Sequence, residues 1–321
     1  MAHLVETMAY AGELPWHGLG VRVNNDLTPR QMMEQAGLDW SVNKVDTYAR
    51  VLSPRVGTPT VEVPTGRQAL LRSTDNKVLT EVGPNWNPVQ NEEAFDFFTK
   101  YCSAGDMEMH TAGSLDGGKM VWVLAKIKES FDVLGEDRVD NYLLFSNPHV
   151  YGKCLNVRMT PVRVVCNNTL TMSLSAKSKN EVSLNHRSTF DPAQVEQQLG
   201  IAHEKFEMYK DMAQFLSRKR FTAESMIEYY NNVFPHADGR KVLKLEDLSG
   251  RAKTAHSVLE TQPGAQYGEG SFWQLLNSVT YATDHILGRN NDTRLQNAWY
   301  GYTRGRKVVA VNDAVRLAEV A

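Results

Sequence analysis

The chain has 321 residues, of which 42% are hydrophobic and 22% charged, and its formal net charge is −2. This composition is that of a globular protein with a large core, and it excludes a disordered, collagen-like or uniformly basic chain. No apolar run reaches transmembrane length, and the opening residues lack the basic start and apolar core of a signal peptide. Three cysteines without a CxxC pair fit a reducing compartment, so we expect a cytoplasmic protein with no membrane contact.

The first third of the chain predicts two helices with strands between them. Residues 28–37 fit a short helix, because Thr28 suits the N-cap and Pro29 the first helical position. Residues 40–82 alternate between apolar and polar side chains and are interrupted by Pro and Gly, which indicates strands separated by turns. The segment TDNK is expected to form a hairpin turn. An amphipathic helix with acidic residues in its first turn is expected over residues 90–101.

The middle of the chain predicts more strands. Residues 105–127 read as two strands joined by the turn SLDGGK, and residues 140–150 as a third. In the next strand, 152–159, Leu155 and its alternate neighbours face one way and the polar residues face the other. A further strand is expected over residues 182–190.

Residues 160–168, TPVRVVCNN, are ambiguous. Thr160 as N-cap and Pro161 in the first turn favour a short helix, in which Arg163 and Asn167 share a face. The β-branched valines favour a strand instead. The helix is the interpretation we prefer from the sequence.

After Pro192 the sequence pattern changes, and apolar residues recur mostly at helical spacing. Helices are expected over residues 192–220, 222–233, 271–287 and 312–320. We therefore predict an α+β fold, with a mixed or antiparallel sheet body and packed helices over residues 1–191. A mainly helical C-terminal region over residues 192–321 would pack on that body.

Positive charge is concentrated in two stretches. Residues 152–187 hold six Lys or Arg against one carboxylate, and residues 289–316 hold six against two. Such asymmetry favours one basic face, although the same cations could also be spread over a solvated surface. Small polar residues surround the first stretch, and the second includes LQNAWYGYTRGRKVV, which sets aromatic residues beside cations. This mixture is typical of proteins that hold phosphates and stack unpaired bases.

We therefore expect nucleic-acid contacts from cations that neutralise phosphates and from two tyrosines that stack on bases. The candidate cations are Lys153, Arg158, Arg163, Lys177, Lys179, Arg187, Arg304, Arg306 and Lys307. The candidate stacking residues are Tyr151 and Tyr300.

Motifs of other site classes are weak or absent. The sequence has no phosphate loop, no complete GxGxxG, no HExxH and no GxSxG, so neither a cofactor nor a metal is expected. Cys154, Cys166, His149 and His186 could gather into a metal site, but free cysteines are usually small buried hydrophobes. A Cys166 nucleophile paired with His186 is a further alternative, weaker than simple packing of that cysteine. Whether the chain is an enzyme stays open from these residues.

Three segments resemble one known family. WHGLG near the start, TPVRVVCNNTL in the middle and LLNSVTYATDHILGRNNDTRLQNAWYG near the end are similar, in order and spacing, to the phage- and plasmid-like DUF932 family. The family is named for unknown function, so the resemblance implies a mobile-element context in a bacterial host and no catalytic residues. At the level of architecture only, the expected fold also resembles that of single-strand annealing proteins.

Together these features predict a phage- or plasmid-encoded protein that binds single-stranded DNA and anneals strands during recombination as a homo-oligomer. Two alternatives remain from the sequence. One is an enzyme that processes nucleotides or nucleic acid, and the other is an interaction protein that binds a host factor.

Overall fold

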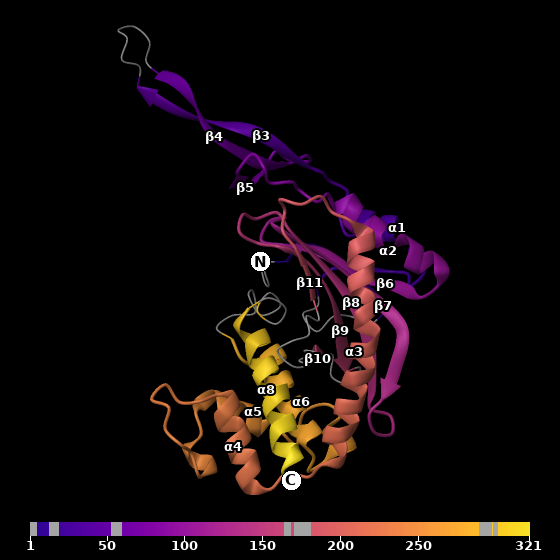
Figure 1. Cartoon of the computed structure of the whole chain (residues 1–321), viewed down its shortest axis with the longest axis vertical. Coiled ribbons are helices and arrows are strands. Elements are labelled where there is room, and N and C mark those ends of the chain that lie inside the picture. The colour runs from indigo at the N-terminus through magenta and orange to yellow at the C-terminus, as the bar shows by residue number, and fades with distance from the viewer. Residues whose placement is uncertain are drawn as a thin grey trace.

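A computed structural model describes residues 5–12, 19–52, 60–163, 168–169, 181–288, 297 and 301–321. The first half of the chain is rich in strands and the second half is helical (Figure 1). The strands are β1 Val5–Ala11, β2 Val21–Val23, β3 Val42–Leu52, β4 Thr60–Arg72, β5 Val78–Val82, β6 Met107–Leu115, β7 Met120–Asp132, β8 Arg138–Pro148, β9 Leu155–Arg163, β10 Asn168–Thr169 and β11 Glu181–Leu184. The α-helices are α1 Pro29–Gln35, α2 Asn91–Ala104, α3 Pro192–Arg218, α4 Ala223–Val233, α5 Gly250–Ser257, α6 Phe272–Tyr281 and α8 Tyr302–Glu319. Short 3-10 helices are η2 Leu245–Asp247 and η3 Ala265–Gly268, and η4 Ala282–Ile286 is a π-helix.

The larger sheet runs in the order β10-β9-β8-β7-β6-β1-β2, and β11 also pairs with β9. Its strands are antiparallel except at β1 and β2, which pair in parallel, so the sheet is mixed. The predicted turn SLDGGK joins β6 to β7, with left-handed backbone at Asp116 (φ +51°) and Gly117 (φ +65°). These are residue types that tolerate such angles, and the expected hairpin is confirmed.

The larger sheet has two faces because side chains alternate along each strand. Val123 and Phe145 point to the face that α1 and α2 cover. Trp122, Leu124 and Tyr142 point to the opposite face, which we call the Tyr142 face. Both faces carry buried apolar clusters, so the sheet is the central layer of this part of the molecule.

The smaller sheet has the order β3-β4-β5, and it contains the predicted TDNK hairpin. The distal parts of β3 and β4 extend beyond β5 as a two-stranded ribbon, which projects from one end of the molecule in Figure 1. Tyr48, Val51 and Leu52 are exposed on this ribbon. A two-stranded ribbon buries little surface, which is why its apolar side chains stay in solvent.

Local sequence signals fix the helix ends. The Thr28 hydroxyl accepts a hydrogen bond from the backbone amide of Gln31, and Pro29 follows as the first residue of α1. Helix α2 ends where Gly105 adopts φ +76°, a left-handed angle that glycine accepts without steric cost. Asp191 caps α3 in the same way as Thr28 caps α1. The predicted helices at these places are confirmed.

Helix α3 connects the two halves of the molecule. Near its start Val195 belongs to the core between the sheet and α1–α2, whereas Ala213 and Leu216 pack in the core of the helical half. That second core joins α4, α5, α6 and α8 and also includes Phe131 and Val139 from the sheet. The expected α+β class, with a sheet body followed by a mainly helical part, is therefore confirmed.

The preference for a helix at residue 160 is wrong. Residues 160–163 continue β9, where Thr160 lies opposite Tyr142 and Arg163 opposite Val139. The strand extends because β8 on one side and β10 and β11 on the other supply ladder partners for it. Residues 164–167 of the same motif lie outside the described residues.

The last predicted helix is longer than expected. Helix α8 begins at Tyr302, ten residues before the predicted start at residue 312. Within the described ranges, no helix combines the length and apolar character that crossing a lipid bilayer requires.

Candidate nucleic-acid interface

Two arginines and a tyrosine form a tight cluster at the start of α8. Tyr302 is half exposed, and the guanidinium carbons of Arg306 and Arg251 lie 4.9 Å and 5.3 Å from the centre of its ring. Both arginines also donate to the Tyr302 hydroxyl, Arg306 at 2.8 Å and Arg251 at 3.0 Å. Cation–π contact of this geometry holds the guanidinium groups in place while leaving donors for a ligand.

The cluster borders a surface groove of about 450 Å³. His236, Ser249 and Gly250 line it together with the arginines, and none of the described lining residues is acidic. Within the described residues, neither Arg251 nor Arg306 makes an ion pair, although Arg306 also donates to the Val233 carbonyl at 3.0 Å. A groove with two guanidinium groups and no carboxylate attracts anions.

Helix geometry adds to this charge. Helix α5 begins at Gly250 and α8 at Tyr302, so the first turns of both helices border the groove. The Ser249 hydroxyl caps α5 by accepting from the amide of Ala252. Helix N-termini carry partial positive charge and unsatisfied amides, which favour a bound anion. The arginines supply the main attraction and the helix ends reinforce it.

The other predicted cations of α8 point inward. The Lys307 side chain is fully buried, and its ammonium donates to Asp284 of η4 at 2.8 Å. Burial lowers the pKa of Lys307, the Asp284 charge opposes that shift, and the positive charges of Arg158 and Arg304 add to it. Arg158 is 8% exposed on β9 and Arg304 is half-buried. Cations from the two basic stretches therefore do meet, but beneath the surface.

Lys307 requires a correction. A buried ammonium already paired with Asp284 cannot reach a phosphate in solvent. The structure therefore removes Lys307 from the candidate contacts. Its neighbour Arg306 keeps that role, because its guanidinium lines the groove.

The remaining predicted residues are either exposed near β9 or outside the described part of the chain. Tyr151, Lys153 and Arg187 are exposed near the start of β9, and the guanidinium of Arg67 lies 5.6 Å from the centre of the Tyr151 ring. The side chain of Arg163 lies outside the described part of the chain, and so do the whole residues Lys177, Lys179 and Tyr300. For these residues the predicted role stays a prediction.

The proposed metal and nucleophile alternatives find little support. His149 is fully buried, with its Nε2 3.2 Å from the Asn91 side-chain oxygen, and burial lowers its pKa to about 3. His186 is buried beside it, stacked on Trp86 with ring centres 4.0 Å apart. Among the described residues, no three His, Cys, Asp or Glu gather as a metal-binding group. Cys166 lies outside the described ranges.

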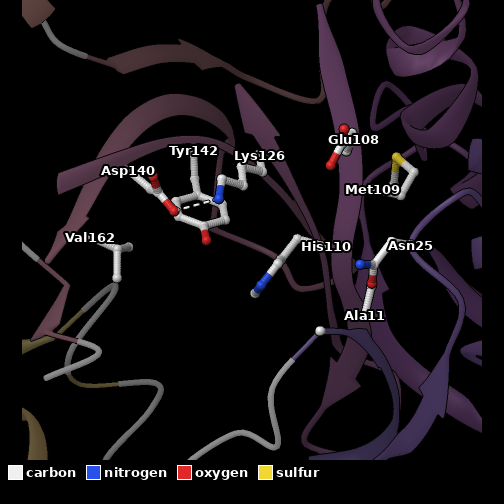
Figure 2. Close-up of a pocket in the computed structure, with 10 residues that line it drawn as sticks. Ala11, Asn25, Glu108, Met109, His110, Lys126, Asp140, Tyr142 and Val162 are labelled. Carbon is white, nitrogen blue, oxygen red and sulfur yellow. Dashed lines mark ion pairs between the residues drawn. The ribbon is translucent and has the colours of Figure 1, made fainter. Parts of the chain in front are cut away.

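A second cavity, of about 250 Å³, opens on the Tyr142 face (Figure 2). His110 projects into it, and Tyr142 lies near, with the two ring centres 4.9 Å apart. On one wall the Asp140 carboxylate accepts from Lys126 at 2.5 Å and from Arg138 at 2.9 Å. Burial, together with the Lys126 charge, lowers the pKa of His110 to about 4, so the imidazole is neutral near pH 7.

Sequence reasoning missed Arg251, His236 and the His110 cavity. Arg251 has only Lys253 as a further Lys or Arg in SGRAKTAH, outside the two basic stretches, and it joins Arg306 only through the packing of α5 near α8. Side chains alternate along each strand, but this alternation alone does not relate one strand to the next. Placing Lys126 and Tyr142 on the same face also requires the strand register, which the sequence does not give.

The comparisons with known proteins give a family. The family model described as a domain of unknown function, DUF932, matches residues 78–300. No curated protein and no solved structure matches the chain. The matched range contains strands β5 to β11 and Arg251 of the groove, and it ends just before Tyr302. Since the match covers more than half of the sequence, the chain belongs to the DUF932 family.

Proposed function

We propose that this protein binds nucleic acid, with single-stranded DNA as the preferred ligand, at the groove lined by Arg251, Tyr302 and Arg306. The observation that carries the proposal is the pair of arginines held on one half-exposed tyrosine ring, in a groove without a described acidic residue. Guanidinium groups bind phosphate oxygens in a forked geometry, and an exposed aromatic ring stacks on an unpaired base.

The exposed residues near the start of β9 are proposed as a second point of contact. Lys153 and Arg187 offer charge there, and Tyr151 offers a ring. A strand that touched both places would follow a path across the molecule and would be held mainly by its phosphates. Such binding depends little on sequence and strongly on salt, because each neutralised phosphate releases a counterion.

Fluorescence anisotropy of a dye-labelled oligonucleotide tests the proposal. With about one phosphate for each of the four cations named above, the logarithm of the binding constant should fall with the logarithm of salt concentration with a slope of about −3 for a single strand. A duplex of the same length serves as competitor. Binding that is independent of salt, or no stronger than that of an uncharged polymer of similar length, rejects the proposal.

Strand annealing in recombination is the next step of the same proposal, in the phage or plasmid setting that the sequence resemblance suggests. Bringing two strands together needs two binding grooves, and therefore an assembly of at least two copies of the chain. Light scattering with and without oligonucleotide measures the assembly, and a donor–acceptor pair on complementary strands measures annealing. Annealing no faster than in buffer alone would leave binding without the recombination role.

A further inference from the structure

The His110 side chain owes its position to a β-bulge. On β6, Met109 pairs with Ala125 and Thr111 pairs with the next residue of β7, Leu124, so His110 is an extra residue between them. A bulge breaks the alternation of the strand and re-aims a side chain, and bulges recur next to functional sites. Here the bulge puts two consecutive side chains, His110 and Thr111, on the Tyr142 face, where strict alternation would send one of them toward α1 and α2.

The bulge leaves a polar atom of the cavity wall unsatisfied. The Nδ1 atom of His110 is buried and has no hydrogen-bond partner among the described residues. An unmade hydrogen bond at a buried polar atom costs about 1–3 kcal/mol, so the fold holds His110 here at a cost to stability. Figure 2 shows the imidazole directed into the cavity, so the unsatisfied atom belongs to a side chain that a ligand there would meet.

The walls of the cavity select against a phosphate. Asp140 and Glu108 place two carboxylates in the lining, and the Lys126 ammonium is already bound to Asp140. The remaining walls are aromatic at His110 and Tyr142, and aliphatic at positions such as Ala11 and Val162. Flat walls with a few polar groups suit an uncharged ring that has donors and acceptors on its edge.

The cavity also lies beside the buried cations described above. Thr160 of β9 is directly opposite Tyr142, and Arg158 is two residues along β9 on the same face, opposite Leu144. Diagonal neighbours of this kind are about 7–8 Å apart in antiparallel sheets. Arg158 is therefore a neighbour of Tyr142 within the sheet, but as a buried residue it is not part of the cavity lining.

We propose that this cavity receives one nucleobase of a bound single strand. The inference rests on the proposed nucleic-acid binding and adds to it a site for a base, distinct from the phosphate-binding groove at Arg306. An inserted base would lie against the rings of His110 and Tyr142, which would explain why His110 stands on the Tyr142 face.

The test compares an ordinary oligonucleotide with one of equal length whose central nucleotides are abasic, which keeps every phosphate. The unmodified chain should bind the base-bearing strand about tenfold more tightly, since stacking and edge contacts of one base are of that order. Val162→Phe fills the cavity, and His110→Ala removes its polar wall. Both variants should lose the part of this preference that the cavity contributes, keep any part that comes from stacking on Tyr302 or Tyr151, and keep the salt slope of the unmodified chain.

His256→Ala is the matched control, because His256 is half-buried on α5 and does not line the cavity. It should keep the tenfold preference, and thermal melting should show each variant folded. Val162→Phe keeps the test decisive if His110→Ala fails to fold. A preference that Val162→Phe leaves unchanged in size overturns the base site and leaves the proposed function standing. Absence of any oligonucleotide binding by the unmodified chain overturns both.

Discussion

Arg306 and Lys307 are consecutive residues of α8, yet they belong to opposite environments. Arg306 lies on a tyrosine ring at the edge of a groove, with no carboxylate partner among the described residues. Lys307 is fully buried and bound to Asp284. The helix turns by about 100° per residue, so neighbouring side chains point in different directions and the surrounding elements decide which of them meets solvent.

A basic run in a sequence is therefore not the same as a basic surface. The outward cations, Arg251 and Arg306, line the groove, where a ligand can reach them. The inward cations, Lys307 with Arg158, contribute to the core of the molecule, where a charge is tolerated only with a partner. Variants on the two sides should therefore separate stability from binding.

The largest expected effect is a loss of stability when the buried cation Lys307 is replaced. Lys307→Ala leaves the Asp284 carboxylate buried without its ammonium, which costs about 3–5 kcal/mol of folding free energy. Urea unfolding followed by circular dichroism measures this loss. Val309→Ala, an exposed position on the same helix, should change stability by less than about 0.5 kcal/mol. Equal stability of the two variants would contradict the distinction between inward and outward cations.

A second prediction concerns stability at low pH. It involves two histidines, His110 and His149, that the fold keeps uncharged instead of pairing them with a carboxylate. The folded-state pKa values of His110 and His149 are lowered to about 4 and about 3, below the ordinary value of 6.5. Below pH 6.5 the unfolded chain therefore binds protons that the folded chain does not, and stability falls as the pH decreases toward 4. The difference at His110 corresponds to roughly 3 kcal/mol at most.

Urea midpoints at about pH 7 and about pH 4.5 measure this fall in stability, since they bracket the range in which the unfolded histidines take up protons. His110→Gln removes one of the histidines whose pKa the fold lowers, so its midpoint should fall less between these pH values than that of the unmodified chain. Carboxylates contribute to both proteins alike and cancel in the comparison. An identical fall in both would show that His110 is not held neutral by the fold.

The next largest effect is a loss of oligonucleotide binding when Arg251 and Arg306, the cations that line the groove, are replaced. Arg251→Ala combined with Arg306→Ala should weaken oligonucleotide binding by about tenfold or more, since each charge-assisted hydrogen bond contributes about 1.5–3 kcal/mol. The salt slope should also become less negative by about 0.7 for each phosphate that the variant no longer neutralises. Arg30→Ala, at an exposed arginine paired with Glu34 on α1, is the matched control and should change neither quantity. A double variant with unchanged slope would remove the groove from the interface.

The smallest effect on binding is expected for Lys153 and Arg187, the exposed cations near the start of β9. Lys153→Ala with Arg187→Ala should lower affinity about two- to threefold at low salt, since exposed charges are screened by solvent. The effect should vanish above roughly 0.5 M salt, where the screening length is short. Anisotropy titrations at two salt concentrations measure it, and an effect that persists at high salt would indicate a direct structural role for these residues.

Much of the fold could be predicted from local signals. The caps at Thr28 and Asp191, the turn at Asp116 and Gly117, and the helical periodicity after Pro192 each act over a few residues, and the structure contains the elements they predict. The prediction for residues 160–163 is wrong because Pro161 and the valines give opposite local preferences. The ladder with β8 resolves that conflict in favour of the strand.

The candidate site divides in the same way. The concentration of cations and aromatic residues near residues 152–187 and 289–316 follows from the amino-acid sequence without any fold, because composition is a local property. Three further facts required the folded chain: Arg251 joins Arg306, Lys307 is buried with Asp284, and a bulge turns His110 toward Tyr142. Those outcomes depend on strand register and helix packing between residues far apart in the chain, and a one-residue change in either would exchange an exposed side chain for a buried one.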